Sequence, residues 1–119
     1  MKLITNDCLL AMRSIQDETI DMVYLDPPFF SQTKQKLKDS SGVEYCFSDY
    51  WDSKKEYIEF MRDRLIETHR IINCTGSVFL HCDSSASHYL RTILDDIFGE
   101  KNFRSEIIWS YKRWSNSKK

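Results

Sequence analysis

The sequence predicts an α/β fold, a partial Rossmann-like sheet of mostly parallel strands joined by helical crossovers. Two observations predict this class. Residues 20–25 are predicted as a strand that is apolar without alternation from Met22 to Leu25, which is typical of a strand covered on both faces of a parallel sheet. Apolar residues that recur every three or four positions indicate helices before and after a second apolar run at 76–82. Strands and helices interleaved in this way build one layered domain with its sites at the carboxyl ends of the strands.

The first part of the chain predicts a helix, a turn, a strand and a loop. Asp7 is placed to cap a short helix, and residues 16–19 have the composition of a turn. Three apolar residues mark this helix: Leu9, Leu10 and Met12. The first strand ends abruptly at Pro27. Residues 31–48 are polar and without periodicity, so we expect a long mobile loop there, and long loops in compact domains are often functional.

The remaining elements follow from caps and periodicity. Ser53 and Glu56 have the S-x-x-E form in which both residues satisfy backbone donors, so a helix is expected to begin there. Its apolar face has five members: Ile58, Met61, Leu65, Thr68 and Ile72. A second helix ends at Gly99. Its apolar residues are Ala86, Tyr89, Leu90, Ile93, Leu94 and Ile97. We expect a third strand at 106–111 and a basic tail at 112–119.

Length and charge set limits on the class of protein. The 119 residues fit one domain at most, which is small for an enzyme of two substrates. With 41% hydrophobic and 29% charged residues, the composition is that of a soluble globular chain. The formal net charge is -1, but residues 101–119 carry six basic residues and one acidic residue, which gives 6 - 1 = +5. Such a segment is compatible with contact to a phosphate backbone and equally with a solvated tail.

Cysteine usage and hydropathy indicate the compartment. The four cysteines Cys8, Cys46, Cys74 and Cys82 show no C-x-x-C spacing. Three of them lie in apolar sequence, where a reduced thiol packs as a small hydrophobe. No apolar run approaches the roughly 20 residues needed to cross a bilayer, and the first residues lack the apolar core of a signal peptide. We therefore expect a cytoplasmic protein in a reducing environment.

The motif Asp26-Pro27-Pro28-Phe29 directly follows the first strand. Such a string arises by chance on the order of once per thousand chains of this length. The Asp26 carboxylate and the Pro27 carbonyl, held rigidly by the prolines, can accept both hydrogens of a planar amino group. The ring of Phe29 can stack on a base rotated out of a duplex. The competing interpretation is a rigid turn in which Asp26 caps the backbone and Phe29 packs in the core.

With this motif the chain resembles the amino-methyltransferases of restriction-modification systems, in particular the permuted class that carries its catalytic motif near the N-terminus. The resemblance covers nearly the whole chain, and its most specific parts are 26–29 and 81–83. The matching stretches are Asn6-Asp7-Cys8, 20–29, 76–83, His88-Tyr89-Leu90, Phe98-Gly99, Asn102-Phe103 and 106–109. By this resemblance, residues 1–119 are the N-terminal, catalytic-motif portion of a methyltransferase domain, and the cofactor half of the sheet is missing.

The resemblance implies S-adenosylmethionine-dependent methylation of the adenine amino group in DNA, because related cytosine enzymes more often carry Ser in place of Asp26. Methylation of amino-cytosine, RNA or protein amide stays open, as does a noncatalytic fragment that binds DNA or a partner. The implied partners are double-stranded DNA, together with a restriction subunit or a second copy of the chain. Asp7 and Asp26 are implied to contact the cofactor, although helix capping is a competing role for Asp7.

The sequence lacks the glycine-rich loop that a methyltransferase needs for its cofactor. Gly42, Gly76 and Gly99 lie far apart, and no G-x-G occurs. By the resemblance that loop follows this segment, so we expect the chain to stop before it. We therefore predict weak or no binding of S-adenosylmethionine by this chain alone. We also predict self-association through the open edge of the strand at 20–25.

Further residues are candidates for lining the site or binding the substrate: Phe30, His81, Asp83, Lys112 and Arg113. His81 and Asp83 end a strand beside the catalytic loop, and a purely structural histidine is an equal alternative. No metal site is expected, because neighbouring residues such as His81 and Cys82 point to opposite faces of a strand. Trp109 is expected to pack in the core from the third strand.

Overall fold

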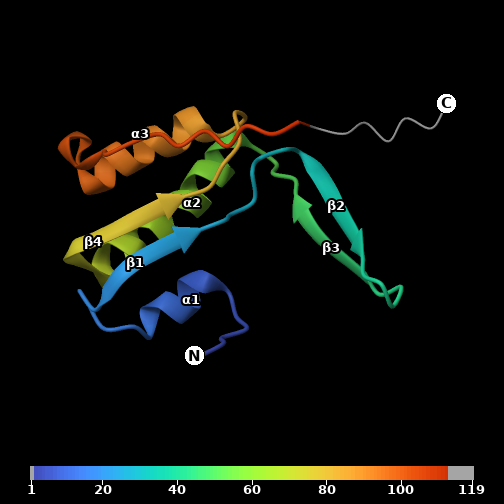
Figure 1. The fold of residues 1–119 in the computed structure, drawn as a ribbon, viewed down its shortest axis with the longest axis horizontal. Coiled ribbons are helices and arrows are strands. Elements are labelled where there is room, and N and C mark those ends of the chain that lie inside the picture. The colour runs from blue at the N-terminus through green and yellow to red at the C-terminus, as the bar shows by residue number, and fades with distance from the viewer. Residues whose placement is uncertain (1, 113–119) are drawn as a thin grey trace.

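A computed structural model describes residues 2–112, which form an α/β arrangement (Figure 1). The predicted fold class is therefore confirmed. The elements in chain order are α1 (Cys8–Arg13), β1 (Ile20–Leu25), β2 (Thr33–Lys38), β3 (Glu44–Asp49), α2 (Lys54–Ile71), β4 (Ile72–Leu80), α3 (Ser87–Phe98) and the short 3₁₀ helix η1 (Glu100–Asn102). Strands β1 and β4 form a parallel pair, and β2 and β3 form a separate antiparallel hairpin.

The parallel pair β1–β4 sets the position of the motif at residues 26–29. Val23 lies opposite Val78 and Leu25 lies opposite Leu80, so the carboxyl ends of both strands meet at the same edge. The register shifts between Ile20 and Met22. Gly76 lies at this irregularity, where a Cβ atom would be only 3.0 Å from the backbone oxygen of Asp21, which explains a residue without a side chain.

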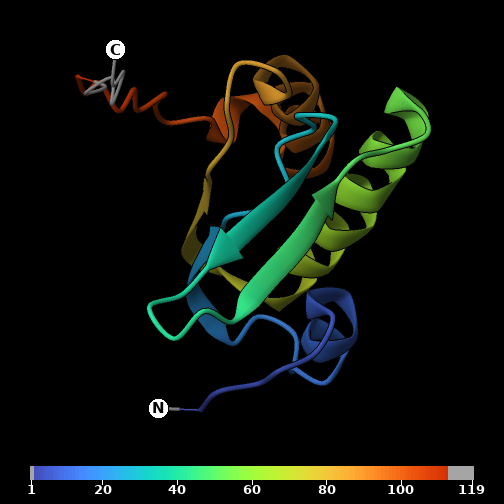
Figure 2. The same cartoon turned by 90° about the vertical axis from the view of Figure 1, so that its right-hand side faces the viewer.

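Helices α2 and α3 pack together on one face of the parallel pair, as Figures 1 and 2 show from two sides. The fully buried cluster comes from these helices and the residue before α3: Tyr57, Met61, Leu65, Ala86, Leu90 and Ile93. Leu25 and Leu80 pack against this cluster from the strands. Burial of these apolar side chains is the main force that holds the helices on the sheet.

The predicted helix caps are confirmed. The Asp7 carboxylate accepts a hydrogen bond from the backbone amide of Leu9 at the start of α1. Ser53 accepts one from the amide of Glu56 at the start of α2, while the Glu56 carboxylate accepts from the amide of Asp52. Gly99 follows α3 with a φ of +85°, a left-handed conformation that glycine adopts at little cost.

The sequence predicts a long mobile loop over 31–48. This prediction is wrong, because the segment contains most of the β2–β3 hairpin. Cross-strand backbone hydrogen bonds hold the hairpin in register from Thr33 opposite Asp49 to Lys38 opposite Glu44. At its tip the Asp39 carboxylate accepts hydrogen bonds from the amides of Ser41 and Val43. The hairpin projects from the body (Figure 1), and its strands lack the apolar alternation that marks a strand packed on a core.

The other strands also differ from the sequence prediction. Strand β1 is covered on one face only: Met22 and Tyr24 are 61% and 59% exposed because both helices pack on the opposite face. Strand β4 spans 72–80 rather than 76–82, since helix α2 continues into it without a loop. Ile72 is therefore the C-cap of α2 and not a member of its apolar face.

The predicted third strand at 106–111 does not form, and the described residues there have no regular structure. Its backbone forms no hydrogen bonds with β1 or β4, although each of these two strands has only one strand partner in the described part of the chain. Ile107, Ile108 and Trp109 are about four-fifths exposed, so the prediction that Trp109 packs in the core is also wrong. Residues 113–119 of the predicted basic tail lie outside the described residues.

Two smaller expectations concern cysteines and membranes. All four cysteines are free thiols, but Cys8, Cys46 and Cys74 are exposed, so the expected packing of three cysteines among apolar residues is wrong. Cys82 is half-buried against the core. Across residues 2–112, no helix combines the length and the apolar character that crossing a membrane requires.

Candidate active site

The motif 26–29 lies where strands β1 and β4 end. The backbone amide of His81 donates to the carbonyl of Leu25 over 2.8 Å, which fixes the start of the loop against the end of β4. A cavity of about 600 Å³ opens beside it. The cavity is lined by Asp26, Pro27, Pro28, Phe29, Ser31, Asp49 and Asp83. The fold thus brings Asp83 together with the whole motif at one edge of the sheet.

Asp26 is exposed at this cavity, and its carboxylate has no hydrogen bond or ion pair with any residue between 2 and 112. The competing interpretation, in which Asp26 caps the backbone of a rigid turn, is therefore not what the structure contains. An unpartnered carboxylate on a cavity wall has all its acceptor positions open to a hydrogen-bond donor.

Tyr57 holds the motif at Pro28 from the core side of the loop. Its ring is fully buried, and its hydroxyl donates a 3.1 Å hydrogen bond to the carbonyl of Pro28. Burial raises the pKa of Tyr57 above its usual value, and the charges of Cys82 and Asp49 add to the shift, so the hydroxyl stays protonated and continues to donate. By contrast, no residue in the described part of the chain donates to the Pro27 carbonyl.

Phe29 and His81 form a stacked pair. Their ring centroids are 5.3 Å apart and the ring planes differ by 11°. The Nδ1 atom of His81 is 3.0 Å from the hydroxyl of Tyr24, which orients the imidazole. His81 therefore supports Phe29 and does not line the cavity itself. Among the described residues, no group of three or more His, Cys, Asp or Glu side chains is arranged to hold a metal ion.

Asp49 is a buried carboxylate that holds the end of the loop. It is 3% exposed and accepts hydrogen bonds from the backbone amides of Phe30 at 2.8 Å and Ser31 at 2.6 Å. Burial alone would raise the pKa of Asp49, but the hydrogen bonds from Ser31 and Phe30 outweigh it and hold the pKa below its usual range. No local sequence pattern indicated this role, because Asp49 directly follows the segment that was predicted as a loop.

Phe30 does not line the cavity as the sequence predicted. Its φ of +63° turns the backbone, and its ring packs against Tyr57 with the centroids 5.0 Å apart. Phe30 therefore belongs to the core beneath the loop. Lys112 is exposed and is not among the residues that line the cavity, and Arg113 lies outside the described residues.

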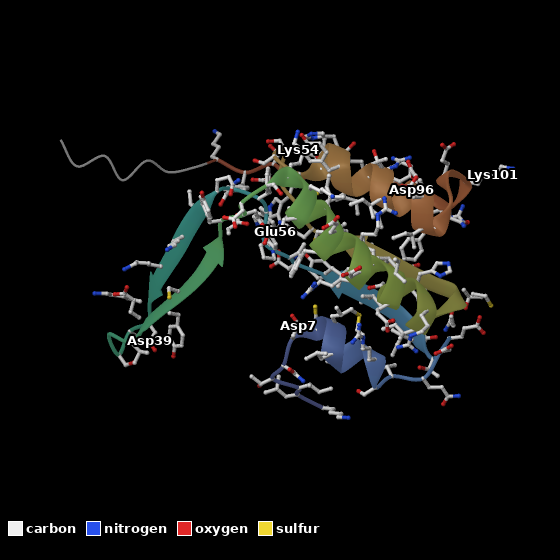
Figure 3. The ribbon with its side chains drawn as sticks, turned by 180° about the vertical axis from the view of Figure 1, so that it is seen from behind. Asp7, Asp39, Lys54, Glu56, Asp96 and Lys101 are labelled. Carbon is white, nitrogen blue, oxygen red and sulfur yellow. The ribbon has the colours of Figure 1, made fainter. Side chains whose placement is uncertain are left out.

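Asp7 lies apart from the cavity, at the start of α1 (Figure 3). One carboxylate oxygen accepts from the Leu9 amide at 2.8 Å and the other from the Arg64 guanidinium at 2.6 Å. Desolvation opposes these contacts, but the Leu9 amide and Arg64 together lower the pKa of Asp7. Arg64 also stacks over the ring of Phe60 at 3.4 Å. Both oxygens of Asp7 are thus occupied by structural partners.

The described residues do not form a cradle for a nucleoside cofactor. Gly42 lies in the hairpin turn, Gly76 at the irregularity of β4, and Gly99 behind α3. None of the three forms a glycine-rich turn between a strand and a helix, which is the local structure that lets backbone approach such a ligand closely. The described residues therefore do not supply the glycine-rich turn that such a cofactor requires.

The parallel pair β1–β4 thus ends in an open carboxylate, a free carbonyl and an aromatic ring that is stacked on His81. In a comparison with known proteins, a family model described as DNA methylase matches residues 20–119, and the chain belongs to this family.

Restriction-modification methyltransferases are among the relatives. The type II methyltransferase M.HinfI of Haemophilus influenzae is 34% identical over 82 residues, which cover 66% of this chain and 23% of that protein. The type II methyltransferase M.KpnI of Klebsiella pneumoniae is 29% identical, covering 84% and 24%. The type III enzyme StyLTI Mod subunit of Salmonella typhimurium is 27% identical, covering 92% and 20%. The chain thus spans between a fifth and a quarter of the length of these relatives.

Proposed function

We propose that this chain provides the catalytic loop of a DNA methyltransferase that methylates the exocyclic amino group of adenine within a restriction-modification system. The observation that carries the proposal is the open carboxylate of Asp26 beside the free carbonyl of Pro27 at a cavity of about 600 Å³. A cavity of this size is in the usual range for small-molecule sites, roughly 300–1,000 Å³, and has room for one flat base.

Asp26 and Pro27 would act on the amino nitrogen together. The lone pair of an exocyclic amine is delocalised into the ring, so the nitrogen is a poor nucleophile while it stays planar. The Asp26 carboxylate accepts one amino hydrogen and the Pro27 carbonyl accepts the other, which directs the lone pair out of the ring plane. Methyltransferases of this family use S-adenosylmethionine, which supplies the methyl group. The Tyr57 hydrogen bond to Pro28 keeps the loop in place without using the Pro27 oxygen.

Phe29 would hold the base. One face of its ring is stacked on His81, so the ring is fixed and its other face is left for a base that has rotated out of the duplex. Base–aromatic stacking is worth about 1–3 kcal/mol and offsets part of the cost of leaving the helix. The proposal includes double-stranded DNA as the substrate, a restriction subunit as a partner, and the cytoplasm as the compartment.

Adenine is preferred over cytosine because the motif begins with Asp26, and amino-cytosine is the alternative. The test uses the full-length protein, unmethylated genomic DNA and mass spectrometry of the released nucleosides. We expect N6-methyladenine, whereas N4-methylcytosine would assign the alternative.

Asp26→Asn is expected to abolish methyl transfer while the melting temperature stays near that of the wild type. Asp63→Asn, an exposed carboxylate on α2, is the matched control. Substantial activity in Asp26→Asn would contradict the mechanism.

A further inference from the structure

The β2–β3 hairpin carries an ordered row of positive charge. Side chains alternate between the two faces of a strand, so Lys34, Lys36 and Lys38 lie on the same face of β2. All three are exposed, and we call this surface the lysine face. At about 3.4 Å per residue, it is roughly 14 Å long. Figure 3 shows side chains that end in nitrogen along β2, pointing away from the body, with Asp39 at the tip of the hairpin.

Three acidic residues accompany the lysines, but two of them are used inside the structure. The Asp39 carboxylate is held by the tip through Ser41 and Val43, and Asp49 is buried against the catalytic loop. Among the described side chains of the hairpin, Glu44 is the acid that shares the lysine face, opposite Lys38.

Glu44 forms ion pairs with two of the lysines. One of its oxygens is 3.0 Å from the Lys36 nitrogen and the other is 3.7 Å from the Lys38 nitrogen. Both lysine side chains are 69% exposed in these pairs, and exposed pairs contribute only about 0–1 kcal/mol. The lysine face therefore keeps a net positive charge, and its weak pairs can be exchanged for a stronger anion.

The base of the hairpin is fastened to the catalytic loop. Asp49 binds the amides of Phe30 and Ser31, and both Asp49 and Ser31 line the cavity of Asp26. The side chain of Gln32 donates to the carbonyl of Trp51 at 3.0 Å and accepts from its amide at 2.8 Å. The lysine face is thus held at a defined position relative to the cavity, and the hairpin extends outward from it (Figures 1 and 3).

We propose that the lysine face binds the phosphate backbone of duplex DNA beside the base that enters the cavity. The proposal rests on the proposed function in taking DNA as the substrate. Phosphates recur about every 3.4 Å of helix axis along one strand, so a row of lysines roughly 14 Å long lies beside several of them. An isolated two-stranded hairpin is only marginally stable in water, and seating on the duplex supplies contacts that its own fold does not.

The test measures binding of the full-length protein to duplex DNA of mixed sequence at several salt concentrations. In a variant with Lys34→Gln, Lys36→Gln and Lys38→Gln, we expect weaker binding by the same factor on duplexes with and without a methylation site. The plot of log Kd against log salt concentration should become shallower by about 0.9 for each lysine that contacts a phosphate. Changing the same lysines to Arg keeps the charges, so the wild-type slope is expected.

The control variant combines Lys2→Gln, Arg13→Gln and Lys55→Gln, which removes three exposed charges that lie outside both the hairpin and the basic segment 101–119. An unchanged slope in the hairpin variant, or an equal change in the control, would overturn the proposal. The single Lys→Gln variants repeat the measurement one charge at a time, in case the triple variant unfolds.

A wild-type protein that binds DNA without methylating it contradicts the proposed function, while the salt dependence of its binding still tests the lysine face. If the wild type binds no duplex DNA, both proposals fail.

Discussion

The buried carboxylate of Asp49 accepts a 2.6 Å hydrogen bond from the backbone amide of Ser31, and this bond joins the β2–β3 hairpin to the loop that carries Asp26. The backbone on either side of Ser31 is left-handed, with φ values of +63° at Phe30 and +58° at Gln32. Such conformations cost about 1–3 kcal/mol each for residues other than glycine. The hydrogen bonds to Asp49 offset this cost and thereby keep the turn that directs Phe30 into the core.

The first prediction concerns Asp49→Asn, which keeps the size of the side chain and removes its charge. An amide oxygen can accept one of the two loop amides, but the amide nitrogen then faces the other. We expect a loss of about 1–3 kcal/mol in the free energy of unfolding, measured by urea denaturation at neutral pH. We also expect lower methyl transfer by the full-length variant. Asp63→Asn, on the solvent side of α2, should leave both quantities unchanged.

The difference in the free energy of unfolding between the wild type and Asp49→Asn should decrease as the pH falls. Because the pKa of Asp49 is lower in the folded protein than its ordinary value of 3.8, its stabilisation is fully present above that value. It is lost as the pH falls below 3.8 and through the folded pKa. The stability gap between the wild type and Asp49→Asn should therefore narrow on acidification. A gap that stays constant between neutral pH and acid would contradict this role of the carboxylate.

The second prediction separates the two roles considered for Asp7. Asp7→Ser keeps an oxygen that can cap α1 but removes the partner of Arg64, which is 9% exposed. If the role of Asp7 is structural, Asp7→Ser and Asp7→Ala both lower the melting temperature, and Asp7→Ala lowers it more. Arg64→Met should reduce the effect of each change, since the ion pair is already lost. The KM for S-adenosylmethionine in the full-length protein should stay the same, and a large rise in it would indicate a cofactor contact instead.

The sequence predicted well those parts of the fold in which a local structure requires a particular type of residue. Asp7, Ser53 and Gly99 mark helix ends because a short acceptor side chain or a left-handed backbone is needed there. The apolar faces of α2 and α3 follow from helical spacing. The hairpin was missed because it is held by backbone hydrogen bonds and projects from the core, so burial leaves no pattern in its sequence.

In the candidate site, too, the features with a local sequence pattern were predicted and those that depend on distant contacts were missed. The motif that begins at Asp26 was found because it is a contiguous string at the end of a strand. Tyr57 and Asp49 hold that string in place, yet each contacts it from a distant position in the chain. Nothing in the local sequence distinguishes Tyr57 from an ordinary core residue of a helix. Only the packing of α2 beneath the loop gives its hydroxyl a partner.

The last prediction concerns the uncovered face of the parallel pair. Met22, Tyr24 and Phe79 are between 41% and 61% exposed on this face, and β1 has a strand partner on one edge in the described part of the chain. An exposed apolar strand with an open edge is a surface on which another chain can pair. The 119-residue chain alone should therefore self-associate with increasing concentration, as measured by light scattering. Met22→Glu should reduce this association, because a charge on the strand disfavours pairing. Ile66→Glu, an equally sized change at an exposed position of α2, should leave it unaltered. A monodisperse monomer of the unmodified chain, or the same effect from both substitutions, would show that this face is not the contact.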